Sequence, residues 1–567
     1  MHLSQVHIEH FRGIPRLSLP LDPVTVVIGE NNQGKTSVLD VLGLCLGRPG
    51  EPVPTRFRDH DFHRPAGGDG AVRPIRLRLS FEAGPDGLST TEEEELAPAL
   101  VEGSAGGREL HVEFIGTPDG EPLRTRFLDA GGEALEPQPP EEVLVALRRL
   151  HPVLLLRFAH DAPLRGPGPK SQAFPGREER RSERALEGQI GRVYRELMDT
   201  RGPVPPDHLD QGLAAARTLF ERIQARRGGA ADPLGRILGE LVGAADGGGG
   251  RGDAALARAG SGSHTLGLLL VLGALLDVRG TSHLPREAHP LIAIEEPEVH
   301  LHPILLASTW DVIESLSAQT LVTTHSGELL ASVPLGHLRR LARRDGEVDV
   351  RRLRPGTLSG TDLRRVAYHV RAKRGSALFA RCWLLVEGES EFWLMRGLAQ
   401  LLGYDLDAEG VHCVEFAQCG VEPLVKLADD LGIGWHLLSD GDESGALYHH
   451  DATRHLDGRP VATRITRLEH PDVERALWEH GYADLYREAA GVGAPGRNPK
   501  GRSPEWVIAK AVRKASKPYL ALSAVEAVAK RGADGVPAGL RHAVEASVRL
   551  ARASGDRASA PAAASAG

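Results

Sequence analysis

Four acidic residues in the C-terminal third of the chain have the types and spacing of a divalent-metal site. Glu387 and Glu391 follow one short apolar run, and Asp440 and Asp442 follow another farther along the chain. Carboxylate oxygens are hard ligands that suit Mg²⁺ or Mn²⁺ better than zinc. We therefore expect a site for Mg²⁺ or Mn²⁺. The alternative is that each acid is only a solvated loop residue at the end of a strand.

Two buried strands are the elements that must position these acids. Residues 383–386 and 435–438 are short apolar runs, each soon followed by a glycine, which is typical of buried strands. Helical spacing of apolar residues follows the first run over residues 392–402. Open α/β sheets place their sites at the carboxyl ends of parallel strands. The pattern predicts an α/β fold in which one sheet edge gathers the acids.

A phosphate-binding loop is predicted near the N-terminus. The apolar run 24–28 leads into GENNQGKTS, and helical spacing follows over residues 37–46. Glycines let backbone N–H groups approach phosphates, and a helix N-terminus favours the anion. The lysine of this loop reaches the β- and γ-phosphates, and the threonine is placed to ligate Mg²⁺. The predicted ATP-binding residues are Gly29, Asn31, Asn32, Gly34, Lys35, Thr36 and Ser37.

Two later strand ends fit the same ATPase. The apolar run 291–294 ends in Glu295 and Glu296. We expect Glu295 to coordinate Mg²⁺, directly or through water, and Glu296 to polarise the attacking water. The run 321–324 ends at His325, which we expect to reach the γ-phosphate as a switch. A histidine at a strand end that is merely structural is the alternative.

The phosphate-binding loop at residues 29–37 and the acids at residues 295–296 lie far apart in the sequence, which predicts an insertion between them. Compact GTPases and kinases do not tolerate such a gap, whereas ATPases of the ABC type do. Residues 165–250 have helical spacing in parts, and we expect a helical insertion that serves dimerisation or lever action. A helical flap without a partner is the alternative. Ser261 lies in a Gly/Ser turn before an apolar helix, where a partner subunit's γ-phosphate would bind. We therefore predict a homodimer, with higher oligomers possible.

Composition limits the classes of partner. The 567 residues allow two or more domains. Lys+Arg 68 against Asp+Glu 76 gives a net charge of −8, so contact with nucleic acid must use local patches. The arginine-rich stretch 334–381 is a candidate surface for the phosphate backbone, although solvated arginine-rich helices occur without DNA. Without an apolar leader or a membrane-length apolar run, we expect a cytoplasmic protein with no membrane partner.

Together these motifs resemble those of the overcoming-lysogenization-defect (OLD) family of ATP-dependent nucleases. GENNQGKT, the GSGS turn, IAIEEPEVHLHP and VTTHS resemble SMC/RecF-like ATPases, and VEGESE and SDGDESG resemble a Toprim domain. The resemblance implies an ABC-type P-loop ATPase domain over residues 1–375 and a Toprim nuclease domain, with a Rossmann-like parallel sheet, over residues 376–550. Residues 551–567 predict a disordered tail.

Two departures from the family pattern bear on the hydrolysis rate more than on nucleotide binding. His264 stands where such ATPases often carry glutamine in the signature, and Glu295 stands where many carry aspartate. A longer carboxylate can still reach the metal ion from the strand end. We therefore still expect ATP to bind.

The resemblance also implies further residues of a nuclease site. In the family, an acid after a third strand completes a second metal site, and Glu469 is the first choice here and Glu474 the second. Family members use a lysine beside the scissile phosphate. Lys517, at a predicted helix start, is the best match, with Lys514 and Lys510 as competitors.

The implied mechanism is two-metal phosphodiester hydrolysis by water. Two divalent ions about 4 Å apart would clamp the attacking and leaving oxygens. We expect one ion on Glu387, Glu391 and Asp440, and the other on Asp442 with the acid after the third strand. The prediction is an ATP-gated DNA endonuclease in phage defence or DNA repair. The alternative is an ATP-driven DNA-binding or sensing module with a non-catalytic Toprim domain and a helicase or nuclease partner.

Overall fold

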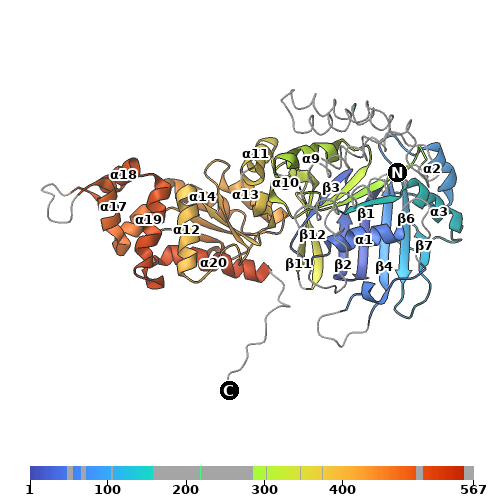
Figure 1. Cartoon of the computed structure of the whole chain (residues 1–567), viewed down its shortest axis with the longest axis horizontal. Helices are drawn as coiled ribbons and strands as arrows, with labels where there is room; N and C mark the ends of the chain where they lie inside the picture. Colours follow the sequence, from blue (N-terminus) through green and yellow to red (C-terminus); the bar gives the residue numbers. More distant parts are fainter. Residues whose placement is uncertain are drawn as a thin grey trace, which may run out of the picture. The chain divides into compact units, whose positions relative to one another are not determined.

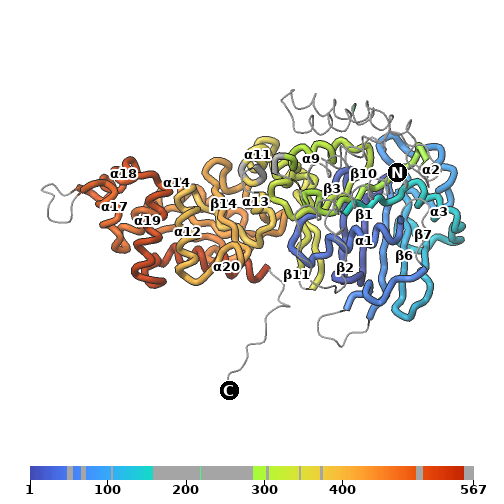
Figure 2. The backbone as a smooth tube through the Cα atoms, viewed as in Figure 1, coloured from blue at the N-terminus to red at the C-terminus, as the bar shows by residue number. Residues whose placement is uncertain are grey.

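The computed structural model describes most of the chain outside the predicted insertion (Figures 1 and 2). The described residues are 1–47, 55–64, 72–103, 106–157, 218, 285–299, 301, 303–344, 346–372, 375–492 and 502–554. The chain divides into two compact units, residues 1–342 with 347–350 and residues 343–346 with 351–567. The predicted insertion, except residue 218, lies outside the described residues, as do Ser261 and His264. The predicted tail begins inside a helix that ends at Ser554.

An antiparallel sheet opens the first unit, with strand order β2-β1-β4-β6-β5 and β7 paired to β6. Its strands are β1 (His2–Phe11), β2 (Ile14–Pro20), β4 (Ile75–Glu82), β5 (Leu100–Glu102), β6 (Arg108–Gly116) and β7 (Arg124–Leu128). Buried residues alternate with more exposed ones along β4, as expected of a strand with one face on a core. That face belongs to a core that also includes residues of the first helix.

The second sheet of this unit carries the ATPase motifs and has strand order β12-β11-β3-β10-β9-β8. Its strands are β3 (Val24–Ile28), β8 (Val153–Arg157), β9 (Leu291–Glu295), β10 (Gln319–Thr323), β11 (Leu338–Arg344) and β12 (Glu347–Arg351). The strands β3, β10, β9 and β8 are parallel neighbours, and Thr323 pairs with both Val27 and Glu295. The carboxyl ends of these strands therefore lie side by side.

Helices of the first unit complete this arrangement. Those in the described residues are α1 (Lys35–Cys45), α2 (Thr90–Glu95), α3 (Glu141–Leu150), α9 (Pro303–Ser315) and α10 (Gly327–Leu330). Helix α1 buries Val38, Leu39 and Leu42, which share one face at helical spacing. This face joins the core and fixes the helix N-terminus directly after β3.

The arginine-rich stretch 334–381 is not a continuous basic surface. Arg339 and Arg340, in β11, are buried, and Arg339 pairs with Asp22 at 2.5 Å. In the second unit, Arg354 pairs with Asp430 at 2.6 Å. Strand β11 lies between β12 and β3, and residues on both of its faces are buried from Leu338 to Leu341, so the prediction of a phosphate-binding surface is wrong for Arg339 and Arg340.

A four-stranded parallel sheet organises the second unit, in the order β14-β13-β15-β16. Its strands are β13 (Cys382–Val386), β14 (Val411–Glu415), β15 (Gly434–Ser439) and β16 (Ile465–Arg467). Every residue of β13 is buried, as expected where helices cover both faces of a parallel sheet. The predicted α/β fold of this part and its two predicted strands are confirmed.

The helices of the second unit surround this sheet and extend beyond it (Figure 1). They are α11 (Gly360–Val366), α12 (Glu389–Leu401), α13 (Val421–Asp430), α14 (Glu443–Thr453), α15 (Val461–Arg464), α16 (Val473–Leu477), α17 (Ala483–Ala490), α18 (Pro504–Lys514), α19 (Lys517–Ala529) and α20 (Ala538–Ser554). Helix α20 packs on β15 and β13, and α12 packs on α19. In the ranges that the structure describes, no helix has the length and apolar character needed to cross a membrane.

His436 makes the sheet of the second unit sensitive to acid. Its ring is fully buried, with Nδ1 3.1 Å from the carbonyl oxygen of Thr463 and Nε2 2.8 Å from the hydroxyl of Thr466. A carbonyl only accepts, so Nδ1 donates its proton and Nε2 accepts from the hydroxyl. Burial lowers the pKa of His436 from 6.5 to about 4.

We expect this histidine to cost stability in acid. Between pH 6.5 and about 4 the unfolded chain takes up a proton that the folded chain rejects, so stability falls as pH falls through this window. The full shift corresponds to about 3 kcal/mol. In urea unfolding at several pH values, His436→Gln should lose less stability in acid than the wild type. Equal losses would contradict this explanation.

Candidate active site

The predicted nucleotide-binding loop joins β3 to α1 in the first unit. Gly34 caps α1 with φ 94°, and a Cβ atom there would come within 2.6 Å of the Ile14 side chain, so only glycine fits. The Lys35 ammonium donates to the carbonyl oxygens of Gly29 at 2.8 Å and of Glu30 at 2.7 Å. Burial lowers the pKa of Lys35 to about 8, although the charges of Glu296 and Glu30 oppose the shift. The nucleotide-binding loop therefore holds the Lys35 ammonium by hydrogen bonds to its own backbone carbonyl oxygens.

The two side chains predicted to hold Mg²⁺ in the ATPase touch each other. The Thr36 hydroxyl donates to Oε1 of Glu295 at 2.5 Å, because α1 begins beside the carboxyl ends of the parallel strands. Arg157, at the end of β8, lies 3.0 Å from Oε2 of Glu295 and also pairs with Asp40. A hydroxyl and a carboxylate in contact are a donor set that fits Mg²⁺ beside bound phosphates.

The two predicted catalytic residues of the ATPase also lie together. Nε2 of His325 is 3.6 Å from a carboxylate oxygen of Glu296. Burial lowers the pKa of His325, the positive charge of Lys35 lowers it further, and Glu296 opposes both. Glu298, which the sequence did not single out, accepts hydrogen bonds from the Thr324 hydroxyl at 2.7 Å and the His325 backbone N–H at 2.8 Å. Glu298 thereby holds the segment that carries His325.

The remaining loop residues lie at the rim of this site. Asn31, Asn32 and Thr36 are exposed, Ser37 is half-buried, and Asn32 has a positive φ of 67°. Among the described residues, contacts join Lys35 to Gly29, Thr36 to Glu295 and His325 to Glu296, each a pair of residues that the sequence assigned to the ATP site. Ser261, predicted from the Gly/Ser turn, lies outside the described residues.

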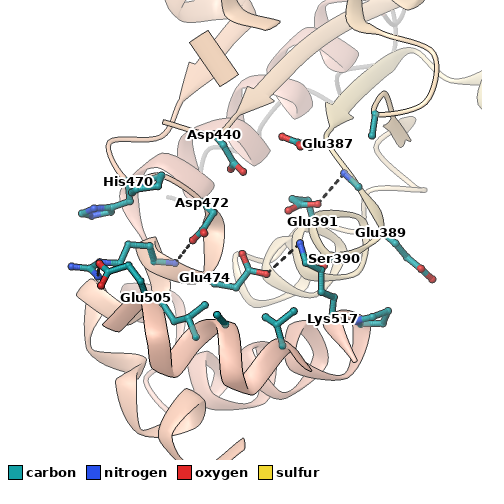
Figure 3. Close-up of a pocket in the computed structure, with 18 residues that line it drawn as sticks. Glu387, Glu389, Ser390, Glu391, Asp440, His470, Asp472, Glu474, Glu505 and Lys517 are labelled. Atoms are coloured by element: carbon teal, nitrogen blue, oxygen red, sulfur yellow. Dashed lines mark hydrogen bonds and ion pairs between the residues drawn. The ribbon is translucent and has the colours of Figure 1, made fainter. Parts of the chain in front are cut away.

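A cavity of about 650 Å³ lies at the carboxyl edge of the parallel sheet in the second unit (Figure 3). Seven acids from four separate stretches line it. They are Glu387, Glu389 and Glu391 after β13, Asp440 after β15, Asp472 and Glu474 at the start of α16, and Glu505 in α18. In Figure 3 the side chains of Asp440, Glu391 and Glu474 lie around one space, and Glu389 points away from it. The cavity therefore concentrates carboxyl groups.

Local hydrogen bonds orient these acids. Glu391 accepts from the Gly388 backbone N–H at 3.0 Å through its Oε2 atom, in the first turn of α12. Asp472 caps α16 and accepts from the Arg475 backbone N–H at 2.6 Å. The Lys517 ammonium, at the start of α19, is 4.0 Å from a carboxylate oxygen of Glu474. Glu391 and Asp472 are therefore each held at a helix start, which fixes their positions beside the cavity.

Burial and crowding raise the pKa values of these carboxyls. Burial is the largest cause for Asp440, followed by the charges of Glu391 and Glu387, and the pKa rises to about 8. Burial raises the pKa of Glu391 to about 7. The pKa values of Glu387 and Glu474 are also raised, again mainly by burial. The raised pKa values mean that these crowded carboxyls lack enough neighbouring positive charge. A divalent cation would supply that charge, so the carboxyls are a chemically suitable donor set for one.

The acids line the cavity without forming a closed coordination shell. Within the described parts of the chain, no three His, Cys, Asp or Glu residues are clustered closely enough to hold a metal ion. The cavity is large compared with one ion, so its size leaves space for a phosphate group beside the acids. The donor chemistry fits Mg²⁺ or Mn²⁺, and Lys517 adds one positive charge at the wall.

Two family models match consecutive parts of the chain. A family described as "Protein of unknown function (DUF2813)" matches residues 1–377, and one described as "Overcoming lysogenization defect protein-like, TOPRIM domain" matches residues 378–442. The uncharacterized protein YbjD of Escherichia coli (strain K12) is 34% identical over 98% of this chain and 100% of its own. The chain is an OLD-like protein of the DUF2813 family.

More distant relatives include a named nuclease. The OLD nuclease of Thermus scotoductus (strain ATCC 700910 / SA-01) is 24% identical over 78% of the OLD-like protein and 82% of its own chain. The C-terminal region of the Burkholderia pseudomallei OLD protein is 20% identical, covers 30% of this chain and 99% of its own, and has a TM-score of 0.26. The SMC head domain from Thermotoga maritima is 12% identical, covers 62% of this chain and 100% of its own, and has a TM-score of 0.34. The fold assignment rests on the sheets themselves and the family matches.

Two predicted metal residues of the OLD-like protein lie outside the cavity lining. Asp442 caps α14, where its side chain accepts from the Gly445 backbone N–H at 2.7 Å. Glu469 is exposed, because β16 ends at Arg467 and the chain turns before it reaches Asp472. Glu474, the second choice, lines the cavity. A three-residue strand gives too weak a pattern to locate its own end from sequence.

The structure separates the three candidate lysines. Lys517 lines the cavity. Lys510 lies with its ammonium 5.2 Å from the centre of the Trp506 ring, and Lys514 is exposed; neither lines the cavity. The position of Lys517 follows from the helix start that the sequence indicated.

Proposed function

We propose that this OLD-like protein is an ATP-binding, metal-dependent DNA endonuclease. The observation that carries the proposal is the convergence of Glu387, Glu391, Asp440 and Glu474, from distant parts of the chain, on one cavity beside Lys517. The distant likeness to a protein named OLD nuclease supports DNA as the substrate.

The residues that line the cavity have two roles in this proposal, to hold divalent cations and to bind the phosphate. Glu387, Glu391 and Asp440 would hold one divalent cation, and Glu474 with Asp472 would help to hold a second. The bound cations would supply Lewis-acid activation of the phosphodiester and of the attacking water. The Lys517 ammonium binds a phosphate oxygen and balances the negative charge that develops during cleavage.

The ATPase residues serve nucleotide binding and hydrolysis in the same proposal. Lys35 binds the β- and γ-phosphates, and Thr36 with Glu295 would hold Mg²⁺. Glu296 orients the attacking water, and His325 contacts the γ-phosphate. Ser261 would complete the site of a partner subunit in a homodimer. ATP binding would then gate DNA cleavage, and the wider role in defence or repair is a family-level expectation.

A plasmid-nicking assay tests the nuclease proposal. Wild-type protein should relax supercoiled plasmid in Mg²⁺ or Mn²⁺ and not in EDTA. Glu387→Ala should reduce the rate at least about 100-fold, since even indirect metal contacts are worth 10- to 100-fold. Glu526→Ala is the matched control, because Glu526 is exposed on α19 and does not line the cavity. If the wild type does not cut, or Glu387→Ala cuts equally well, the sensing module becomes the better account.

A further inference from the structure

A basic and aromatic cluster on α18 and the residues just before it lies next to the acidic cavity and has no part in the chemistry above. Trp506 is 37% exposed. The guanidinium carbon of Arg502 lies 3.9 Å from the centre of the Trp506 ring, and the ammonium of Lys510 lies 5.2 Å from it. We call Arg502, Trp506 and Lys510 the α18 cluster.

The α18 cluster is continuous with the wall of the cavity. Glu505, the residue before Trp506, lines the cavity, and so do Ile508, Ala509 and Val512 of the same helix. Figure 3 shows Glu505 beside the cavity, opposite the side of Lys517. One face of α18 therefore lines the acidic cavity, and the exposed Trp506 lies on the same helix, next to the lining residue Glu505.

The charge of α18 favours an anionic partner. Arg513 and Lys514 are exposed on the same helix and add to the charges of the α18 cluster. Glu505 is the one acid of this helix, and Arg475 pairs with it. A protein with a net charge of −8 thus carries positive charge beside this acidic cavity. Unpaired nucleic acid has the two groups that such a surface binds, phosphates for the cations and bases for the ring.

We propose that the α18 cluster binds a single-stranded segment of the DNA substrate, with a base stacked on the Trp506 ring and neighbouring phosphates on Arg502 and Lys510. The inference deepens the proposed nuclease function and rests on DNA being its substrate. A base needs an exposed aromatic face, and a paired duplex does not offer one, so single strands or unpaired ends are the preferred form. The cations flanking the ring add attraction that salt weakens.

Binding of a short fluorescent oligothymidylate, measured by anisotropy in EDTA, tests this inference. Trp506→Ala should weaken binding about fivefold or more, as expected for one lost base stack. Trp506→Phe should retain most of the affinity, because a ring remains. Tyr368→Ala is the matched control, because Tyr368 is a 58% exposed aromatic residue of the same unit that does not line the cavity. Arg502→Gln with Lys510→Gln should reduce the slope of log Kd against log salt by about 1.4.

The outcomes separate this inference from the nuclease proposal, because no cleavage occurs in EDTA. Equal affinity of Trp506→Ala and wild type would overturn the α18 cluster as a DNA surface, even if the wild type cuts plasmid. A change only in sedimentation mass would also overturn it and assign Trp506 to contact between copies of the chain. Weakened binding by Trp506→Ala would support the surface even if wild-type protein cuts nothing.

Discussion

Asp440→Asn should abolish metal-dependent DNA cleavage while making the metal-free protein more stable. The loss of cleavage should be at least about 100-fold, because Asp440 lines the cavity and the charges of Glu391 and Glu387 act on its carboxyl. The gain in stability has an electrostatic cause. Asparagine has nearly the same shape as aspartate and is always neutral, so folding no longer requires the uptake of a proton or the crowding of another negative charge.

The pH dependence of this effect has a defined sign. The pKa of Asp440 is raised from 3.8 to about 8, so between these values the folded, metal-free chain keeps a proton that the unfolded chain releases. Stability of the wild type should therefore fall as pH rises through this window, and Asp440→Asn should remove that part of the decline. Protons also compete with the cation, so cleavage at limiting Mg²⁺ should rise as pH approaches 8.

Thermal unfolding with and without Mg²⁺, together with the nicking assay, measures both effects. Mg²⁺ should raise the Tm of the wild type, and Asp440→Asn should lose this response. Asp442→Asn is the control, because asparagine caps a helix as well as aspartate does and Asp442 does not line the cavity. If Asp442→Asn lost cleavage as completely as Asp440→Asn, the cavity would not be the metal site that we propose.

Lys35→Ala should abolish ATP turnover. The Lys35 ammonium is held at the loop carbonyls and is the positive charge that the loop presents to the phosphates. Its removal should lower turnover at least about 100-fold, as the loss of a charge-stabilising donor does. Phosphate release under saturating ATP measures the effect. Lys426→Ala, which removes a surface lysine paired with Glu422, should leave turnover unchanged. Undiminished turnover in Lys35→Ala would refute the site.

The same variant separates the two units. Lys35 and the cavity acids belong to different compact units, so the Mg²⁺-dependent rise in Tm attributed to Asp440 should persist in Lys35→Ala. Plasmid nicking by Lys35→Ala, with and without ATP, then shows whether nucleotide activates or restrains cleavage. If ATP changed the nicking rate of neither the wild type nor Lys35→Ala, the proposal that ATP gates DNA cleavage would be contradicted.

Local patterns were sufficient to predict the residues that follow well-formed strands. Glu387, Glu391 and Asp440 come within five residues of the ends of two apolar runs, and parallel pairing brings such ends to one edge. The contact between Thr36 and Glu295 has the same origin, since β3 and β9 flank β10. In these cases the strand pattern and the topology both constrain the side chain.

Residues positioned by short elements could not be placed in this way. The third acidic stretch follows a strand of only three residues, so its pattern did not distinguish exposed Glu469 from Glu474. Asp472 lines the cavity because it caps a five-residue helix, a role that depends on the turn before it. Arg339 is buried against Asp22, a partner far away in the sequence that composition alone does not reveal.

An anomalous difference map from crystals grown with Mn²⁺ tests the central claim most directly. We expect a manganese peak in the cavity, bounded by Glu387, Glu391 and Asp440, and its disappearance in Asp440→Asn. A map from wild-type protein that cuts DNA with Mn²⁺, yet shows no manganese in this cavity, would contradict the account.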